Sequence, residues 1–201
     1  MNTFEEKIKE KLLLLPSKAK LLFASLLCER LQPHYIAFEE NYKWGDKELF
    51  ENALTLLYGF IINNDSASDD EIKELIVNID LNTPDMEDFG SALSSFALNA
   101  CTSVNSALNY ILDSNVNHVM DIISYTLDTL DMYIQEKENM NTYDPTRDIQ
   151  IDYDNFMIDE KRYQLDLVEK LLTIDLNNIT DNLLDSLRNK HPIIDLSVLR
   201  E

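Results

Sequence analysis

Glycine is scarce in this chain, and its scarcity restricts the fold more than any other feature of the sequence. Only Gly45, Gly59 and Gly90 occur in 201 residues, and no run of alternating apolar and polar residues is bounded by turn signals. Apolar residues recur instead at helical spacing through long segments, which is the main sequence signal for α-helices. We therefore predict an all-α protein that forms a single-domain bundle of about six to eight helices over residues 1–201.

Local signals indicate where the first helices begin and end. Pro16 can open a long helix, and Pro33 is expected to end it, because proline disfavours helical geometry in the residue before it. Asp46 is a plausible N-cap for the next helix. Ser68 and Glu71 have the spacing of a capping box, which predicts a helix start at residue 68.

A central helix is predicted from Thr83, Pro84 and Asp85, which place a hydroxyl, a proline and an acid in the order favoured at a helix start. Many Ser and Ala side chains follow, and small residues let neighbouring helices approach closely. We expect a loop over residues 139–155 and a final helical region from about residue 158. The residues predicted to lie in the core are Leu26, Leu57, Phe96, Ala100, Ile123 and Leu167.

Negative charge limits the partners that the chain can bind. Asp and Glu total 37 against 17 Lys and Arg, a formal net charge of −20, and residues 74–136 contain no Lys or Arg. A field of this sign repels phosphate backbones and anionic lipids, and it attracts basic protein surfaces. We expect no direct nucleic-acid or membrane binding, and a basic protein as the partner. The same acidity can serve solubility alone; the oligomeric state stays open, a homodimer included.

Both cysteines, Cys28 and Cys101, lie in apolar, helix-like runs, where thiols are more often buried than reactive. The apolar run over residues 12–15 is too short for a signal peptide. No stretch approaches the roughly 20 apolar residues that span a bilayer. We expect a cytoplasmic protein with reduced, slowly reacting thiols.

The chain lacks the common motifs of catalysis. Three isolated glycines cannot build a phosphate-binding loop, and no Ser or Cys stands between two glycines as in a nucleophile elbow. We predict no cofactor, and a binding protein is favoured over an enzyme. The alternative is a metal-binding bundle or a hydrolase: His118 and Asp121 lie three residues apart on one helical face, followed by Asp128 and Asp131.

Several segments together carry a family resemblance. The motif residues are Cys28, Glu29, Arg30, Pro33, Tyr35, Gly45, Asp46, Pro84, Glu87, Asp88, Phe89, Asp131 and Tyr133. As a set they resemble the motifs of the YjaG-like bacterial proteins, a family of unknown function. The resemblance covers about residues 21–172 and leaves 173–201 as a C-terminal helical extension. It implies a compact all-helical fold and brings no established activity, ligand or catalytic residue.

The sequence favours a non-enzymatic protein-binding module. Its acidic face would include Asp121, Asp128, Asp131 and Glu136, and an inhibitor of a basic toxin or nuclease, or a nucleic-acid mimic, would fit such a surface. In this hypothesis the family motifs are mainly structural. We expect Glu29 and Arg30 to pair with an acid on the central helices.

Overall fold

The computed structural model describes residues 3–62, 67–141, 143–176, 179–188 and 192–196. Within these ranges the chain is helical and contains no strand, which confirms the all-α prediction. The helices are, in chain order, α1 (Phe4–Leu14), α2 (Ser17–Tyr42), α3 (Lys47–Ile62), α4 (Asp69–Leu81), α5 (Met86–Phe89), α6 (Ala92–Asp113), α7 (Val116–Lys137), α8 (Arg147–Asp152), α9 (Asn155–Thr173) and α10 (Asp181–Leu187).

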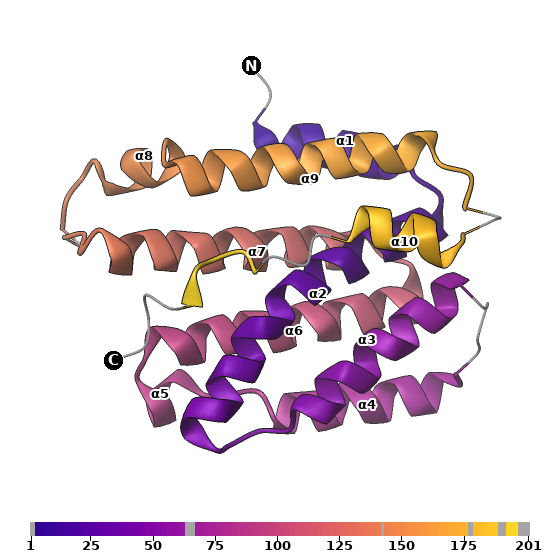
Figure 1. The fold of residues 1–201 in the computed structure, drawn as a ribbon, viewed down its shortest axis with the longest axis horizontal. Helices are drawn as coiled ribbons and strands as arrows, with labels where there is room; N and C mark the ends of the chain where they lie inside the picture. Colours follow the sequence, from indigo (N-terminus) through magenta and orange to yellow (C-terminus); the bar gives the residue numbers. More distant parts are fainter. Residues whose placement is uncertain (1–2, 63–66, 142, 177–178, 189–191, 197–201) are drawn as a thin grey trace.

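Helix α6 lies at the centre of the molecule. It packs against α2, α3, α4, α5 and α7, and its contact with α2 is the most extensive. In Figure 1, α9, α7, α6 and α4 form successive rows, α1 lies beside α9, and α2 and α3 cross in front of α6. The close approach of α2 is possible because small side chains of α6, including Ser95, Ala97 and Ala100, are buried. The predicted central position of this helix is confirmed.

The apolar stripes of the sequence correctly identify the core. All six residues that we predicted there are buried: Leu26, Leu57, Phe96, Ala100, Ile123 and Leu167. The capping box at the start of α4 is also present, because Ser68 accepts from the backbone N–H of Glu71 while the Glu71 carboxylate accepts from the backbone N–H of Ser68.

The prediction that Pro33 ends its helix is wrong. Helix α2 continues through Pro33 to Tyr42. A proline inside a helix removes one backbone hydrogen bond and costs about 3 kcal/mol. Burial offsets this cost here, because Leu31, His34 and Tyr35 lie on both sides of the proline and are almost completely buried.

The start of the central helix is also displaced. Asp85 caps α5, a helix of only four residues that ends where Gly90 adopts a left-handed conformation (φ 57°). Ser91 then caps α6, which begins at Ala92. Phe89, which follows the predicted helix start at residues 83–85, therefore lies on a separate short helix and not on the central one. A glycine and a serine side by side break the helix, since one favours a C-terminus and the other an N-terminus.

Two short helices lie in segments for which we made no helical prediction. Helix α1 begins with a capping box between Thr3 and Glu6 and packs against α9. Helix α8 lies inside the expected loop over residues 139–155. In the described part of the chain, every helix is too short or too polar to cross a lipid bilayer.

Candidate functional site

Two of the motif segments meet at the hydroxyl group of Tyr35, together with Asn82, which lies two residues before the motif residue Pro84. This hydroxyl donates to the backbone carbonyl of Asn82 (3.0 Å) and accepts from the backbone N–H of Asp46 (2.9 Å). Gly45 adopts φ +100°, and a Cβ atom at this position would lie 2.6 Å from the same hydroxyl oxygen. Both the conformation and the space therefore require glycine. These contacts tie α2 to the start of α3 and the end of α4.

The motif segment around α5 packs onto the end of α2. The ring of Phe89 contacts the rings of Phe38, Tyr42 and Trp44 at centroid distances of 4.9, 5.0 and 5.2 Å. Pro84, just before α5, is buried, whereas Glu87 and Asp88 are exposed. The apolar members of this motif thus have a packing role, and its acids contribute to the negative surface.

A polar contact joins α6 to α7 inside the core. The side-chain amide of Asn99 donates to the hydroxyl of Thr129 (3.1 Å), and both groups are buried. One turn further along α7, the Tyr133 ring packs edge-on against Phe156 of α9 (5.5 Å). The motif that contains Tyr133 therefore links three helices.

Glu29 lines a groove of about 450 Å³ between α2 and α3. Its carboxylate accepts from the hydroxyl of Tyr58 (2.5 Å) and from Nε of Arg188 (3.2 Å), which follows α10. The Arg188 guanidinium lies 4.6 Å from the centre of the Tyr58 ring. Burial, and then the Glu29 charge, raise the pKa of Tyr58, so this hydroxyl is a donor at all ordinary pH values. The other residues around the groove are Gln32, Glu51, Leu54, Thr55, Gly59 and Ile62.

Arg30, the next residue along α2, lies in a buried polar cluster between α2 and α9. Its two terminal nitrogens contact both oxygens of Glu160, at 2.9 and 2.8 Å. Gln164 donates to the same carboxylate (2.9 Å), and the Tyr163 ring covers the guanidinium at 4.2 Å. The expectation that Glu29 and Arg30 pair with an acid on the central helices is wrong: Arg30 pairs with Glu160 of α9, and Glu29 pairs with Arg188.

This cluster includes polar atoms without a hydrogen-bond partner in the described residues. They are Nε of Arg30, both ring nitrogens of His34, the Tyr163 hydroxyl and the side-chain oxygen of Gln164. His34 is completely buried one turn along α2 from Arg30. Burial, and to a smaller extent the positive charge of Arg30, lower the pKa of His34 to about 3. The imidazole is therefore neutral at physiological pH.

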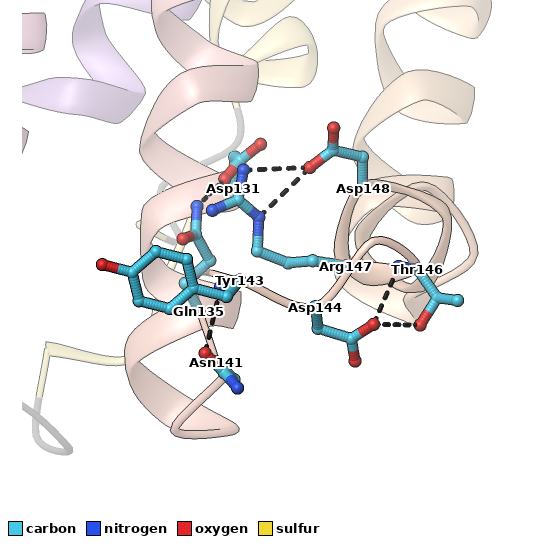
Figure 2. Close-up of polar contacts among 8 residues, drawn as sticks. All are labelled: Asp131, Gln135, Asn141, Tyr143, Asp144, Thr146, Arg147 and Asp148. Atoms are coloured by element: carbon cyan, nitrogen blue, oxygen red, sulfur yellow. Dashed lines mark hydrogen bonds and ion pairs between the residues drawn. The ribbon is translucent and has the colours of Figure 1, made fainter.

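The acidic residues that we predicted as an interaction face are accessible along α7. Asp121, Asp128 and Glu136 are exposed, and Asp131 is half-buried and contacts the side-chain amide of Gln135. Figure 2 shows this part of α7 beside α8, where Arg147 pairs with Asp148 (3.0 Å).

The loop before α8 is held by local hydrogen bonds. The side chain of Asp144 accepts from the backbone N–H and the hydroxyl of Thr146, at 2.8 and 2.7 Å (Figure 2). These bonds lower the pKa of Asp144. They are the contacts of a turn and the start of a short helix.

His118 and Asp121 were the residues considered as metal ligands in the sequence analysis. His118 contacts Asp113 (3.1 Å), five residues before it. In the parts of the chain that the structure describes, no three His, Cys, Asp or Glu side chains gather closely enough to hold a metal ion. The metal-binding alternative thus gains no support from this geometry.

Both cysteines are free and buried, as predicted. Burial raises the pKa of each thiol, that of Cys101 to about 12. The thiolate is the nucleophile, so a raised pKa favours the expected slow reaction of both thiols, which stays a prediction.

A family model described as "Protein of unknown function (DUF416)" matches residues 7–197. The chain belongs to the DUF416 family. The crystal structure of a DUF416 family protein from Shewanella baltica OS155 has a similar fold, with a TM-score of 0.77 and 24% identity over 93% of this chain and 91% of that chain. No curated protein matches the chain significantly.

Membership of DUF416 confirms a family of unknown function, while the narrower YjaG-like name stays a prediction. The family match extends beyond residues 21–172 on both sides and includes Glu160 and Arg188. These two residues complete the contacts of Arg30 and Glu29, and sequence reasoning missed both. No local motif marks either one, because their partners lie 130 and 159 residues away in the chain.

Proposed function

We propose that this DUF416 protein is a non-enzymatic protein-binding module whose acidic helices bind a basic partner. The surface in question, which we call the acidic face, comprises Asp121, Asp128, Asp131 and Glu136 of α7. A charged surface of this kind speeds association with an oppositely charged protein and selects against acidic ones.

The observation that carries this proposal is a lack of compensating positive charge. Residues 74–136 include ten Asp and Glu side chains. Of these ten, all of which the structure describes, only Asp113 has an ion-pair partner in the described residues, namely His118. Carboxylates that serve only local structure are usually paired or act as caps, and the exposed acids of α7 do neither.

The electrostatics of Asp128 supports the same conclusion. Asp128 is exposed, but surrounding protein atoms remove part of the water around its carboxyl group, and this desolvation, followed by the negative charge of Asp131, raises its pKa. The two carboxylates therefore repel each other, and in the described residues neither forms an ion pair: Arg147, which lies on this side of α7, pairs with Asp148 (Figure 2). A basic side chain placed between them would relieve this repulsion, so a basic partner gains binding energy at this point.

Replacing Asp121, Asp128 and Asp131 together by Asn tests the proposal. Proteins that the wild type retains from a cell extract are compared with those that the triple variant retains, and the association rate of a retained partner is then measured at several salt concentrations. We expect the variant to associate more slowly and with a weaker dependence on salt, because exposed charges steer encounters and are screened beyond about 8 Å at physiological ionic strength.

The matched control removes three exposed charges elsewhere, with Glu5→Gln, Glu40→Gln and Asp166→Asn on α1, α2 and α9. It should leave the association rate close to that of the wild type. Equal rates and salt slopes for both triple variants would reject the acidic face as a docking surface. Loss of a bound metal together with lower stability in the Asp variant would support the metal-binding alternative instead.

A further inference from the structure

The groove between α2 and α3 is built from one continuous face of α3. Its α3 residues lie at positions 51, 54, 55, 58, 59 and 62, the spacing of residues that share one face of a helix, so their side chains lie on the same side. Glu29 and Gln32 of α2 form the opposite wall, and Arg188 closes one side. The volume of about 450 Å³ falls in the range of ligand sites.

Arg188 is seated in this groove by two kinds of contact. Its Nε atom donates to Glu29 (3.2 Å), and its guanidinium lies 4.6 Å from the centre of the Tyr58 ring. The hydroxyl of Tyr58 also donates to Glu29 (2.5 Å), which holds the carboxylate beside the aromatic ring. A carboxylate next to an aromatic face is the combination that suits a planar guanidinium better than an ammonium group.

The segment that carries Arg188 is lightly attached to the rest of the molecule. Helix α10 has seven residues and shares no extensive interface with any other helix in the described ranges. Leu184 and Leu187 are its buried apolar residues. Its polar contacts with other elements include the Arg188 pair with Glu29 and the hydrogen bond from Lys170 of α9 to the backbone carbonyl of Ser186 (3.2 Å). Displacing this segment therefore disturbs less packing than moving a central helix.

The groove offers further polar groups beside Arg188. Gln32, Glu51 and Thr55 line it, and their side chains make no hydrogen bond to any described residue. Glu51 is exposed and carries a negative charge that no described Lys or Arg pairs with. A second cationic or donor group that enters the groove thus meets free acceptors.

We propose that the groove between α2 and α3 is an arginine-binding site. Arg188 of the chain's own C-terminal segment occupies it, and an arginine side chain of a basic protein partner takes its place when α10 is displaced. That the incoming arginine belongs to a basic protein rests on the proposed function. The recognition of a guanidinium group by Glu29 and Tyr58 does not depend on it.

The test uses Arg188→Ala and a small probe, N-acetyl-L-argininamide, with binding measured by calorimetry. Removing the internal competitor should strengthen binding of the probe by about tenfold or more relative to the wild type, because the free site is then fully available. N-acetyl-L-lysinamide should bind several-fold more weakly than the arginine probe, since an ammonium lacks the planar fork. If Arg188→Ala fails to fold, Arg188→Gln provides the same comparison with a smaller loss of volume.

Two further variants locate the binding. In the Arg188→Ala background, Glu29→Gln and, separately, Tyr58→Leu should each remove most of the gained affinity, while the Asp121, Asp128 and Asp131 triple change should not. This last variant separates the two proposals, because it tests the acidic face and leaves the groove intact.

Three results would overturn the inference. The first is equal affinity of the wild type and Arg188→Ala for the arginine probe. The second is that Arg188→Ala binds the lysine probe as tightly as the arginine probe, or that the triple change of Asp121, Asp128 and Asp131 removes binding of the arginine probe. Either result would indicate non-specific electrostatic attraction. The third is a wild-type dimer that Arg188→Ala converts to a monomer, because the occupant would then be a second copy of the chain.

Discussion

Glu29 and Arg30 are consecutive residues of α2, and each forms a carboxylate–guanidinium pair with the C-terminal part of the chain. Consecutive side chains point about 100° apart around a helix. Arg30 therefore enters the interface with α9, where the side chains of Arg30 and Glu160 are 7% and 4% exposed. Glu29 enters the groove beside α3, where Arg188 and Glu29 are 26% and 28% exposed.

This difference in burial gives the two pairs different roles. A buried ion pair is no strong source of stability in itself, but loss of one partner leaves the other charge without water or a counter-charge. An accessible pair contributes little, because water replaces either partner at small cost. The Arg30 pair thus fixes α9 against α2, and the Glu29 pair is a contact that another guanidinium can replace.

Arg30→Ala should have the largest effect on stability. We expect the free energy of unfolding to fall by about 3 to 5 kcal/mol, because the Glu160 carboxylate would remain buried without its partner. Chemical denaturation of the variant and the wild type at neutral pH measures this difference.

Replacing both partners by apolar residues is the control for this prediction. Arg30→Met combined with Glu160→Leu should lose less stability than Arg30→Ala alone, since no charge is then left unpaired in the interface. A loss below about 1 kcal/mol for Arg30→Ala would mean that Glu160 reaches water, and the contrast between the two pairs would not hold.

His34 should make the buried side of α2 sensitive to acid. Its pKa in the folded protein is about 3, below the value of about 6.5 in an unfolded chain. At pH values above 6.5 neither state binds a proton. As the pH falls from 6.5 towards 3, only the unfolded state is protonated, so the folded state loses roughly 2 to 3 kcal/mol between pH 6.5 and 4.5.

His34→Leu isolates this contribution from that of the many carboxylates. The free energy of unfolding of both proteins is measured at several pH values, and the difference between them should grow in favour of the variant as the pH falls through this range. A constant difference at all pH values would show that the His34 ring is accessible to protons in the folded protein.

Sequence reasoning succeeded where a signal acts locally. The stripes that contain Leu57, Phe96 and Ile123 correctly indicated the core, because a helix buries one face whatever its neighbours are. The Ser68 and Glu71 cap was also correct, since both partners lie within one turn.

Predictions that depend on packing over long distances failed. Pro33 was expected to end a helix, but burial of the residues around it outweighs the lost hydrogen bond. The partners of Glu29 and Arg30 were sought on the central helices, because nothing in the spacing of Arg188 or Glu160 indicates that the fold brings them to α2. The candidate groove could not be predicted for the same reason: its walls come from three separate segments.

Glu29→Gln should have the smallest effect on stability, and comparing it with Arg30→Ala tests whether the two ion pairs differ in their contribution. We expect a loss below about 1 kcal/mol, because both members of the pair with Arg188 are partly exposed and the neutral amide still accepts from Tyr58. Thermal unfolding of Glu29→Gln beside Arg30→Ala measures both effects under one condition. A loss as large as that of Arg30→Ala would place the Glu29 pair among the structural contacts of α2, and its exchange for a partner's arginine would then be too costly to occur.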